Sequence, residues 1–196
     1  MISPVTKTKG QFAFKKGKYN YYRDELGNLF CKALDQSNMV GGGYEVERNN
    51  DADNQTRLQR VKQLGAGVVL DYGCGNGLLV DYFNKNGVNC FGYDKFHENP
   101  IEIVTAMYDV VTMVEVIEHT HAPFEEIDEI YKALKKGGKV MIETSFSDWL
   151  TEKDSYIEPK VGHAMIFSHK GLDRLMTDKG FTVGNHINNN VRIYIK

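Results

Sequence analysis

Apolar and polar residues along most of the chain follow the two spacings that distinguish strands from helices. The continuous apolar run at 68–70 is typical of a strand that is covered on both faces. Leu58, Val61 and Leu64 are spaced by three residues, which predicts one buried face of a helix. The same patterns predict helices at 54–64 and 78–83, a helix that begins at Pro123 and is ended by Gly137, and a helix after Ser168. They predict strands at 68–70, 88–93, 109–114, 139–144, 181–183 and 191–195.

The order of these elements determines the expected fold. From residue 54 onward strands and helices alternate, and units of this kind pack as a mainly parallel sheet with helices on both faces. We therefore predict an α/β protein with a doubly wound sheet. In such a sheet ligands bind beyond the carboxyl ends of the strands, so the loops that follow the strands should hold the site.

The N-terminal part of the chain differs from the rest in pattern. Three lysines precede an aromatic cluster at 19–22, and the polar stretch 24–28 predicts a turn between two short extended pieces. Three successive glycines at 41–43 indicate a flexible break. We divide the chain into an N-terminal aromatic and basic segment, 1–45, which is a candidate lid, and a main domain, 46–196.

Composition narrows the class of protein. The 196 residues carry 24 Lys and Arg against 26 Asp and Glu, a formal net charge of −2, which argues against nucleic acid as a partner. No apolar run approaches the roughly 20 residues that span a bilayer, and the start lacks the apolar segment of a secretory signal. Cys31, Cys74 and Cys90 leave one cysteine unpaired in any pairing, which is typical of a reducing compartment. We therefore expect a cytoplasmic protein without membrane segments.

The most informative stretch is VLDYGCGNG at 69–77, which leads from a predicted strand into a predicted helix. Glycines in such a loop let the backbone approach a ligand, and the helix N-terminus presents unpaired N–H groups to it. Asp94 ends the next strand, where a carboxylate can accept both hydroxyls of a ribose. A tight turn without a ligand is one alternative. Nicotinamide binding is another, but its G-x-G-x-x-G spacing places the third glycine one residue later.

These motifs resemble those of the class I S-adenosylmethionine-dependent methyltransferases. VLDYGCGNG is similar to their first motif, GYD at 92–94 to their ribose-binding motif, YDVVTMVEVIEH at 108–119 to their fourth-strand motif, and LKKGGKVMIET at 134–144 to their strand-five segment. GHAMIFSHKGLDRLMTDKGF at 162–181 resembles a late helix–strand element of small-molecule members, including the ubiquinone-pathway O-methyltransferases. The resemblance covers residues 54–196 and implies a Rossmann-like fold whose last strand is antiparallel.

One part of the chain departs from this class. Between Asp94 and Asp109 its members usually fit a helix, a third strand and an acidic residue that contacts adenine. Only residues 95–108 are available here, which is too short for all three. The third strand is therefore predicted to be missing or vestigial.

The resemblance implies S-adenosylmethionine as the cofactor and assigns residues to it. Asp94 would bind the cofactor ribose, and Met113 and Val114 would pack near its adenine or its sulfonium. Arg57 is similar to a family arginine that meets the cofactor carboxylate, and a solvated helix face is the alternative for it. Cys74 is interpreted as a packing residue rather than a nucleophile. The residues assigned to the cofactor are Arg57, Asp71, Gly73, Gly75, Gly77, Asp94, Met113 and Val114.

The sequence EVIEH at 115–119 follows the predicted fourth strand. If a helical turn begins at Glu115, the side chains of Glu115, Glu118 and His119 share one face. With His163 from across the site, such a group could hold a divalent cation, and the E-x-x-E-H spacing resembles the metal site of small-RNA 2′-O-methyltransferases. Metal-free relatives carry a similar stretch, so we predict no metal. We interpret His163, His119 and Glu115 as catalytic, with His163 as a general base or a substrate-pocket residue.

These observations predict an enzyme that transfers a methyl group from S-adenosylmethionine to an O, N or C atom of a small-molecule acceptor, such as a sugar or a quinone precursor. The stretch 145–162, which contains Trp149 and Tyr156, is a candidate substrate lid. Two alternatives stay open: an RNA 2′-O-methyltransferase with a Glu/Glu/His metal site, and a non-catalytic module that binds S-adenosylmethionine.

Overall fold

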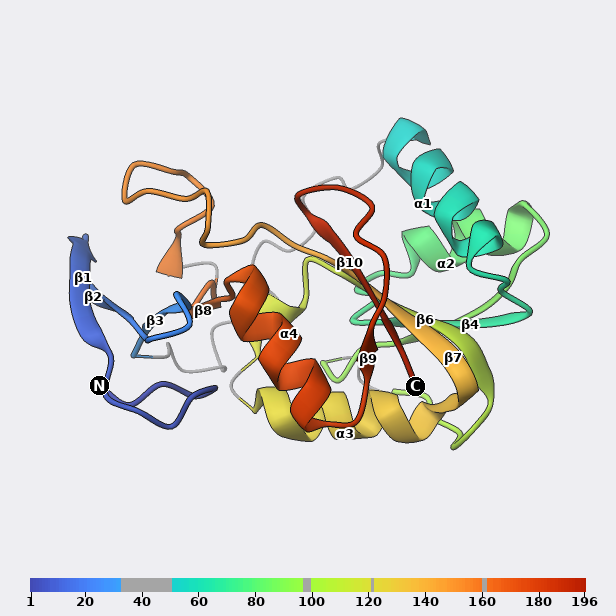
Figure 1. Ribbon diagram of the computed structural model, residues 1–196. Coiled ribbons are helices and arrows are strands. Elements are labelled where there is room, and N and C mark those ends of the chain that lie inside the picture. The colour runs from blue at the N-terminus through green and yellow to red at the C-terminus, as the bar shows by residue number, and fades with distance from the viewer. Residues whose placement is uncertain (33–50, 97–99, 121, 160–161) are drawn as a thin grey trace.

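The central sheet is built from β4 (Val68–Tyr72), β5 (Asn89–Tyr93), β6 (Tyr108–Val114), β7 (Leu134–Glu143), β9 (Thr182–Val183) and β10 (Val191–Ile195) (Figure 1). The computed structural model describes residues 1–32, 51–96, 100–120, 122–159 and 162–196. Within them, the strand order of the sheet is β5-β4-β6-β7-β10-β9. Strands β4, β5, β6 and β7 run parallel to one another. The last strand, β10, is antiparallel to β7, as predicted.

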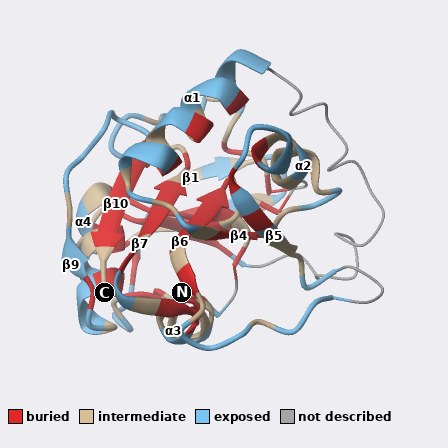
Figure 2. Ribbon diagram, turned by 90° about the vertical axis from the view of Figure 1, so that its right-hand side faces the viewer, coloured by how far each residue is buried: buried red, intermediate tan, exposed pale blue. Residues whose placement is uncertain are grey.

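Helices cover both faces of this sheet (Figure 2). They are α1 (Asp51–Gln63), α2 (Leu78–Lys85), α3 (Pro123–Ala133) and α4 (His169–Asp178). Buried residues of α1 and α2 form one apolar cluster with the sheet, and those of α3 and α4 form another on the opposite face. All residues of β6 but one are buried, as expected of a strand covered on both faces. The predicted doubly wound α/β architecture is confirmed. In the described ranges, no helix has the length and apolar character needed to cross a membrane.

The predicted absence of a third strand is also confirmed for the described residues. β5 lies at the edge of the sheet, and its strand partner is β4. Residues 100–107 return the chain to β6 without forming a strand. The short connection therefore leaves the carboxyl end of β5 beside an irregular segment rather than beside another strand.

A second, antiparallel sheet lies at the side of the molecule where the parallel strands end (Figure 1). Its strands, in spatial order, are β1 (Gln11–Lys16), β2 (Tyr19–Arg23), β3 (Leu29–Cys31) and β8 (Met165–Ile166). The predicted turn at 24–28 joins β2 to β3, and Leu29 pairs with Ile166. The N-terminal segment thus forms a sheet with a strand of the main domain. The glycines at 41–43 lie outside the described residues.

Buried polar groups join this small sheet to the start of α4. The side chain of Ser168 caps α4 by accepting from the N–H of Gly171 at 2.9 Å, as its position predicted. The N–H of Ser168 donates to Oδ1 of Asn28 at 2.9 Å, and Nδ2 of Asn28 donates to Oδ2 of Asp24 at 2.9 Å. A Cβ on Gly171 would lie 1.8 Å from Oδ1 of Asn28. The turn at 24–28 is therefore fixed against the main domain.

One helix ends earlier than its sequence pattern predicts. α3 ends at Ala133 and not at Gly137, because Leu134 is extended and pairs with Tyr108 as the first residue of β7. Gly137, with a φ of 76°, lies inside an irregular part of that strand. Pairing with the neighbouring strand therefore takes precedence over the last turn of the helix.

Candidate active site

Three glycines shape the loop between β4 and α2. Gly73, Gly75 and Gly77 have φ values of 78°, 54° and 81°, in the left-handed region that favours glycine. The N–H of Gly73 donates to the carbonyl oxygen of Tyr93 at 2.7 Å, and the N–H of Gly75 donates to Oδ2 of Asp94 at 3.0 Å. The loop after β4 is thereby tied to the end of β5, and Asp94 is held beside the glycines.

Gly73 also permits a close approach to the segment that follows β6. A Cβ on Gly73 would lie 2.5 Å from Cγ2 and 2.9 Å from Cγ1 of Val116. A Cβ on Gly75 or Gly77 would have no heavy atom within 4 Å. Gly75 and Gly77 are therefore required by the backbone conformation, whereas Gly73 is also required by its neighbour.

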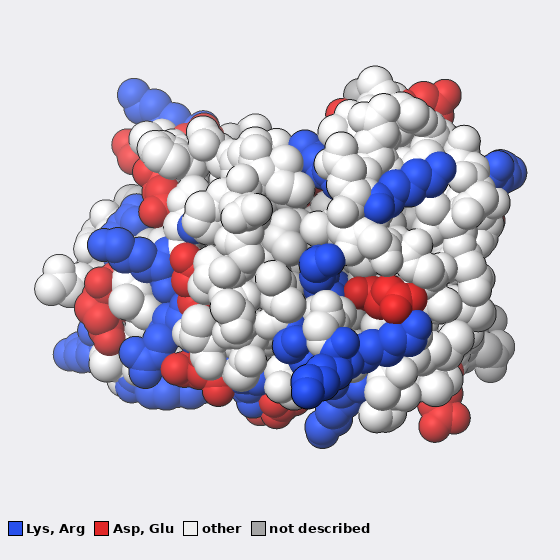
Figure 3. Space-filling view, turned by 45° about the vertical axis from the view of Figure 1, so that its right-hand side comes forward, with Lys and Arg blue, Asp and Glu red and all other residues white. Residues whose placement is uncertain are grey.

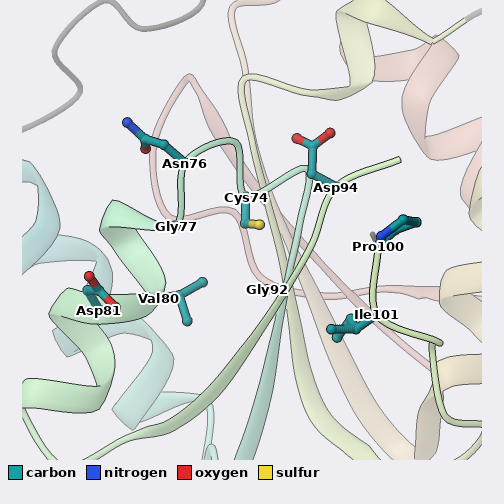
Figure 4. Close-up of a pocket in the computed structure, with 9 residues that line it drawn as sticks. All are labelled: Cys74, Asn76, Gly77, Val80, Asp81, Gly92, Asp94, Pro100 and Ile101. Carbon is teal, nitrogen blue, oxygen red and sulfur yellow. The ribbon is translucent and has the colours of Figure 1, made fainter. Parts of the chain in front are cut away.

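A pocket of about 240 Å³ lies beside this loop (Figure 4). The loop and the first turn of α2 form one wall, and Pro100 and Ile101 form the other. Figure 4 shows the carboxylate of Asp94 above the end of β5, between the two walls. The lining residues are Cys74, Asn76, Gly77, Val80, Asp81, Gly92, Asp94, Pro100 and Ile101.

Cys74 packs against the glycine of β5. A Cβ on Gly92 would lie 2.8 Å from Sγ of Cys74, so the glycine makes room for the thiol. Burial, followed by the charges of Asp71 and Asp94, raises the pKa of the Cys74 thiol to about 12. The thiol therefore stays protonated at neutral pH, and a protonated thiol is a poor nucleophile. This environment favours the interpretation of Cys74 as a packing residue.

Three of the residues assigned to the cofactor are buried in the central strands β4 and β6: Asp71, Met113 and Val114. Oγ1 of Thr112 donates to Oδ1 of the buried Asp71 at 2.7 Å. Met113 is fully buried in the cluster beneath α3 and α4, and Val114 is buried at the end of β6. These residues lie near the carboxyl ends of β4 and β6, below the glycine loop. Their contact with a cofactor stays a prediction.

A carboxylate at the end of β7 engages Arg57. Nη2 of Arg57 lies 2.6 Å from Oε1 of Glu143, and Nη1 of Arg60 lies 3.2 Å from Oε2 of the same carboxylate. Nη1 of Arg57 also donates to Oδ1 of Asn54 at 3.2 Å. The side chain of Arg57 is only 12% exposed, which contradicts the solvated helix face considered as an alternative. Its contact with a cofactor carboxylate stays a prediction.

A helical turn from Glu115, the condition for placing Glu115, Glu118 and His119 on one face, does not form. Glu115 has a φ of 53°, and its N–H donates to the carbonyl oxygen of Glu143 at 2.8 Å, which extends the contact of β6 with β7 by one residue. A 3₁₀ helix, η2 (Ile117–His119), begins two residues later. The placement of Glu115, Glu118 and His119 on one helical face is therefore wrong, because the strand pairing interrupts the turn.

Glu118, His119 and His163 nevertheless come together beyond the end of β6. One ligand atom of each lies within 4.8 Å of the others, and the rings of His119 and His163 are 4.8 Å apart. One carboxylate with two imidazoles suits Zn²⁺ or another borderline divalent cation. Among the described residues Glu115 does not belong to this group, so the four-residue metal alternative is reduced to three ligands.

Hydroxyl groups orient the buried carboxylate of Glu118. Oγ1 of Thr144 donates to Oε2 of Glu118 at 3.1 Å and lies 2.8 Å from the hydroxyl oxygen of Tyr156. The hydroxyl of Thr144 has one hydrogen and donates it to Glu118, so Thr144 accepts from the hydroxyl of Tyr156. Burial, followed by the charges of Glu118 and Glu115, raises the pKa of Tyr156 far above its usual range, so its hydroxyl keeps its hydrogen. The hydrogen bonds therefore run in one direction, from Tyr156 through Thr144 to Glu118.

The position of His163 fixes the form of its ring. Nδ1 of His163 lies 2.5 Å from the carbonyl oxygen of Tyr156, and the two rings are 4.4 Å apart. A carbonyl oxygen only accepts, so Nδ1 carries hydrogen and Nε2 of the neutral ring carries the lone pair. Nε2 is then the nitrogen that removes a proton or binds a metal.

Sequence reasoning missed Thr144 and Glu143 and treated Tyr156 only as a lid residue. Both missed residues stand at the end of β7, where a polar residue after a buried strand is a usable signal. The hydroxyl of Tyr156 has no such signal, because it reaches the site from an irregular segment.

A family model described as the methyltransferase domain matches residues 45–185. The chain belongs to the methyltransferase domain family. The resemblance to the class I S-adenosylmethionine-dependent methyltransferases, inferred from the glycine loop and the motifs after it, is confirmed.

Relatives and solved structures agree with this family. The ubiquinone biosynthesis O-methyltransferases of Psychrobacter arcticus and Erwinia tasmaniensis are 27% and 28% identical over 61% and 64% of this chain. The matched part covers 62% of each relative, so the chain spans less than two thirds of their length.

Two crystal structures share the fold. The 1,6-didemethyltoxoflavin-N1-methyltransferase of Burkholderia thailandensis, with bound 1,6-didemethyltoxoflavin and S-adenosylhomocysteine, has a TM-score of 0.62 at 16% identity, over 95% of this chain and 99% of that one. Human N-acetylserotonin methyltransferase in complex with S-adenosylmethionine has a TM-score of 0.54 at 13% identity, over 74% of this chain and 51% of that one. At these identities the similarity establishes the fold.

Proposed function

We propose that this chain binds S-adenosylmethionine and transfers its methyl group to an O, N or C atom of a small-molecule acceptor. The observation that carries the proposal is the glycine loop after β4, closed onto Asp94 by the hydrogen bond from Gly75. A ligand beyond the strand ends would meet backbone without side chains on one side and a carboxylate on the other. This arrangement suits a ribose joined to an amino-acid tail.

The residues present fit that cofactor. Asp94 already accepts from Gly75 and from the N–H of Phe96, at 3.0 and 2.9 Å, and a carboxylate has room for further donors such as ribose hydroxyls. The pocket beside it has an apolar wall, Ile101, of the kind that an adenine ring requires. Arg57, in the middle of α1, and Glu143, at the end of β7, form a charged pair near the predicted position of the amino-acid tail.

The catalytic chemistry divides between the cofactor and the protein. S-adenosylmethionine, when bound, supplies an electrophilic methyl group on a sulfonium. The protein must orient the acceptor in line with that methyl group and remove the proton of the acceptor atom. We assign the removal of this proton from the acceptor atom to Nε2 of His163. The carboxylate of Glu118, 1% exposed and within 4.8 Å of the imidazole, stabilises the resulting positive charge.

A metal-assisted route is the second candidate for this step, and one observation favours it. Among the described residues Oε1 of Glu118 is buried without a hydrogen-bond partner, as the oxygen of a metal ligand would be. With His119 and His163 it offers three ligand atoms in one place. A bound divalent ion there would lower the pKa of an acceptor hydroxyl.

The charge distribution favours a small molecule over RNA. On the face that Figure 3 shows, Lys and Arg side chains are interspersed with Asp and Glu. The whole chain has a formal net charge of −2. An RNA partner needs a continuous basic surface to neutralise its phosphates. The relatives named as ubiquinone biosynthesis O-methyltransferases support transfer to an oxygen atom of a small molecule.

The function is tested by turnover with a panel of phenolic, quinone-precursor and sugar acceptors, with methylated product measured by mass spectrometry. We expect methyl transfer to a member of the panel together with tight binding of S-adenosylmethionine in calorimetry. Binding without turnover on any acceptor, including small RNA duplexes, would favour the non-catalytic module instead.

The base assignment predicts a large effect of His163→Gln. This variant keeps a polar side chain but removes the basic nitrogen, so kcat should fall about 100-fold or more while the dissociation constant of S-adenosylmethionine stays unchanged. His186→Gln, at an exposed histidine near the start of β10, is the matched control and should retain full turnover. A kcat of His163→Gln within about threefold of the parent would contradict the assignment.

Metal removal separates the two routes. We expect the parent enzyme to keep its full turnover after treatment with a chelator and gel filtration, because His163 acts as the base. Loss of turnover that Zn²⁺, Mn²⁺ or Mg²⁺ restores would instead identify the three ligand atoms as a metal site.

A further inference from the structure

The N-terminal strands hold the main chain at His163. The hydroxyl of Tyr21, in β2, donates to the carbonyl oxygen of His163 at 2.8 Å. The N–H of Cys31, in β3, donates to the carbonyl oxygen of Ala164 at 2.9 Å. Two successive carbonyl groups are thus bound from the small sheet, immediately before β8 joins it as a strand.

The side chain of His163 is held by a segment that packs against the same strands. Its Nδ1 donates to the carbonyl oxygen of Tyr156, and the next residue, Ile157, is fully buried in a cluster with Tyr21. Nζ of Lys16, in β1, donates to the carbonyl oxygen of Asp154 at 2.5 Å. The small sheet therefore fixes both His163 and the group that orients its ring.

Tyr21 itself is placed for this contact. Its side chain has no exposed surface, and its ring stacks on Phe14 with centroids 5.2 Å apart. Phenylalanine would fill the same space, and a buried hydroxyl costs free energy unless it forms a hydrogen bond. Burial also raises the pKa of Tyr21 far above its usual range, so the hydroxyl keeps the hydrogen that it donates.

We infer that Tyr21 is a positioning residue for His163, and that the N-terminal sheet is a fixed wall of the acceptor site that sets the place and the ring form of this histidine. The effect on turnover rests on the proposed function, whereas the effect on the ring form does not. Without the hydroxyl the segment before β8 keeps its strand pairing but loses the contact at His163. The imidazole of His163 is then no longer held in its hydrogen bond to the carbonyl oxygen of Tyr156.

The first test reads the ring form directly and needs no acceptor. In chelator-treated protein labelled with ¹⁵N-histidine, two-bond correlation spectra distinguish Nδ1–H from Nε2–H rings, and His163→Gln identifies the signal of His163. We expect an Nδ1–H ring in the parent and a mixture of both forms in Tyr21→Phe. An unchanged His163 signal in a folded Tyr21→Phe protein would overturn the inference.

The second test compares Tyr21→Phe with Tyr22→Phe. Tyr22 is the next residue of β2, so its side chain lies on the opposite face of the strand from that of Tyr21, and its ring lies 6.2 Å from the ring of Phe30. We expect kcat to fall about 10-fold in Tyr21→Phe with an unchanged dissociation constant for S-adenosylmethionine, and no change in Tyr22→Phe. Equal kcat values in the two variants would overturn the inference. Absence of S-adenosylmethionine binding in the parent would instead refute the proposed function and leave the ring-form test standing.

Discussion

Replacing Asp94 with alanine is expected to reduce the affinity for S-adenosylmethionine about 100-fold or more while the protein stays folded. The carboxylate accepts from the N–H groups of Gly75 and Phe96 and would accept from the ribose as well. Hydrogen bonds to a charged group contribute about 1.5–3 kcal/mol each, so the loss of two ribose contacts accounts for this change. The side chain of Asp94 is only half-buried, at the end of β5, which is why the fold should survive. Isothermal titration calorimetry measures the affinity, and circular dichroism verifies the fold.

Two further variants make the Asp94 result specific. Asp81→Asn removes the charge of another carboxylate that lines the same pocket and should change the affinity by less than about threefold. Asp94→Asn retains one oxygen acceptor and should fall between the parent and Asp94→Ala. An unchanged affinity in Asp94→Ala would contradict the assignment of Asp94 to the ribose of the cofactor. An equal loss of affinity in Asp81→Asn would show that the net charge of the pocket controls binding.

The large sheet was predictable from the sequence because its signals are local. A buried strand such as β4 is a continuous apolar run, and a helix such as α4 has its cap, Ser168, next to its first turn. The missing strand followed from chain length alone, since residues 95–108 are too few for a helix and a strand. These features depend on neighbours in the sequence or on counting residues.

The small sheet was only half predictable. The turn at 24–28 indicated the hairpin of β2 and β3, but the pairing of Leu29 with Ile166 joins residues that are far apart in the sequence. β8 has only two residues, too few to show a period. The N-terminal segment was therefore interpreted as a candidate lid, and the contacts of Asn28 and Tyr21 with the main domain had no sequence signal.

The site divides in the same way. The apolar pattern of a strand predicts where the strand ends, and the glycine loop and Asp94 lie at such ends, so the sequence identifies both. The geometry of Glu115 depends on the carbonyl of Glu143, which only the packed sheet brings near, and for that reason the condition of a helical turn at Glu115 is not met. His163 was named from its motif, but its ring form depends on Tyr156, whose path lies outside any regular element.

Replacing Gly73 with alanine is expected to destabilise the protein by about 2–4 kcal/mol and to weaken binding of S-adenosylmethionine in parallel. Alanine at a φ of 78° costs about 1 kcal/mol, and its Cβ would collide with Val116, 2.5 Å away. Val116 precedes η2, which carries Glu118 and His119, so a displaced Val116 would move the catalytic side as well as the cofactor loop. Denaturant unfolding measures the stability, and calorimetry measures the affinity.

The contribution of the collision can be separated from that of the backbone. Gly75→Ala shares the left-handed conformation but meets open space, so it should cost only about 1 kcal/mol. In the Val116→Ala background the Cγ atoms that Gly73→Ala would strike are absent and only the Cβ, 3.3 Å away, remains, so the cost of Gly73→Ala should fall close to that of Gly75→Ala. If Gly73→Ala costs the same as Gly75→Ala, and the same again in the Val116→Ala background, then contact with Val116 does not restrict the residue at position 73. The close approach of the two segments would then play no part in joining the cofactor side of the site to the catalytic side.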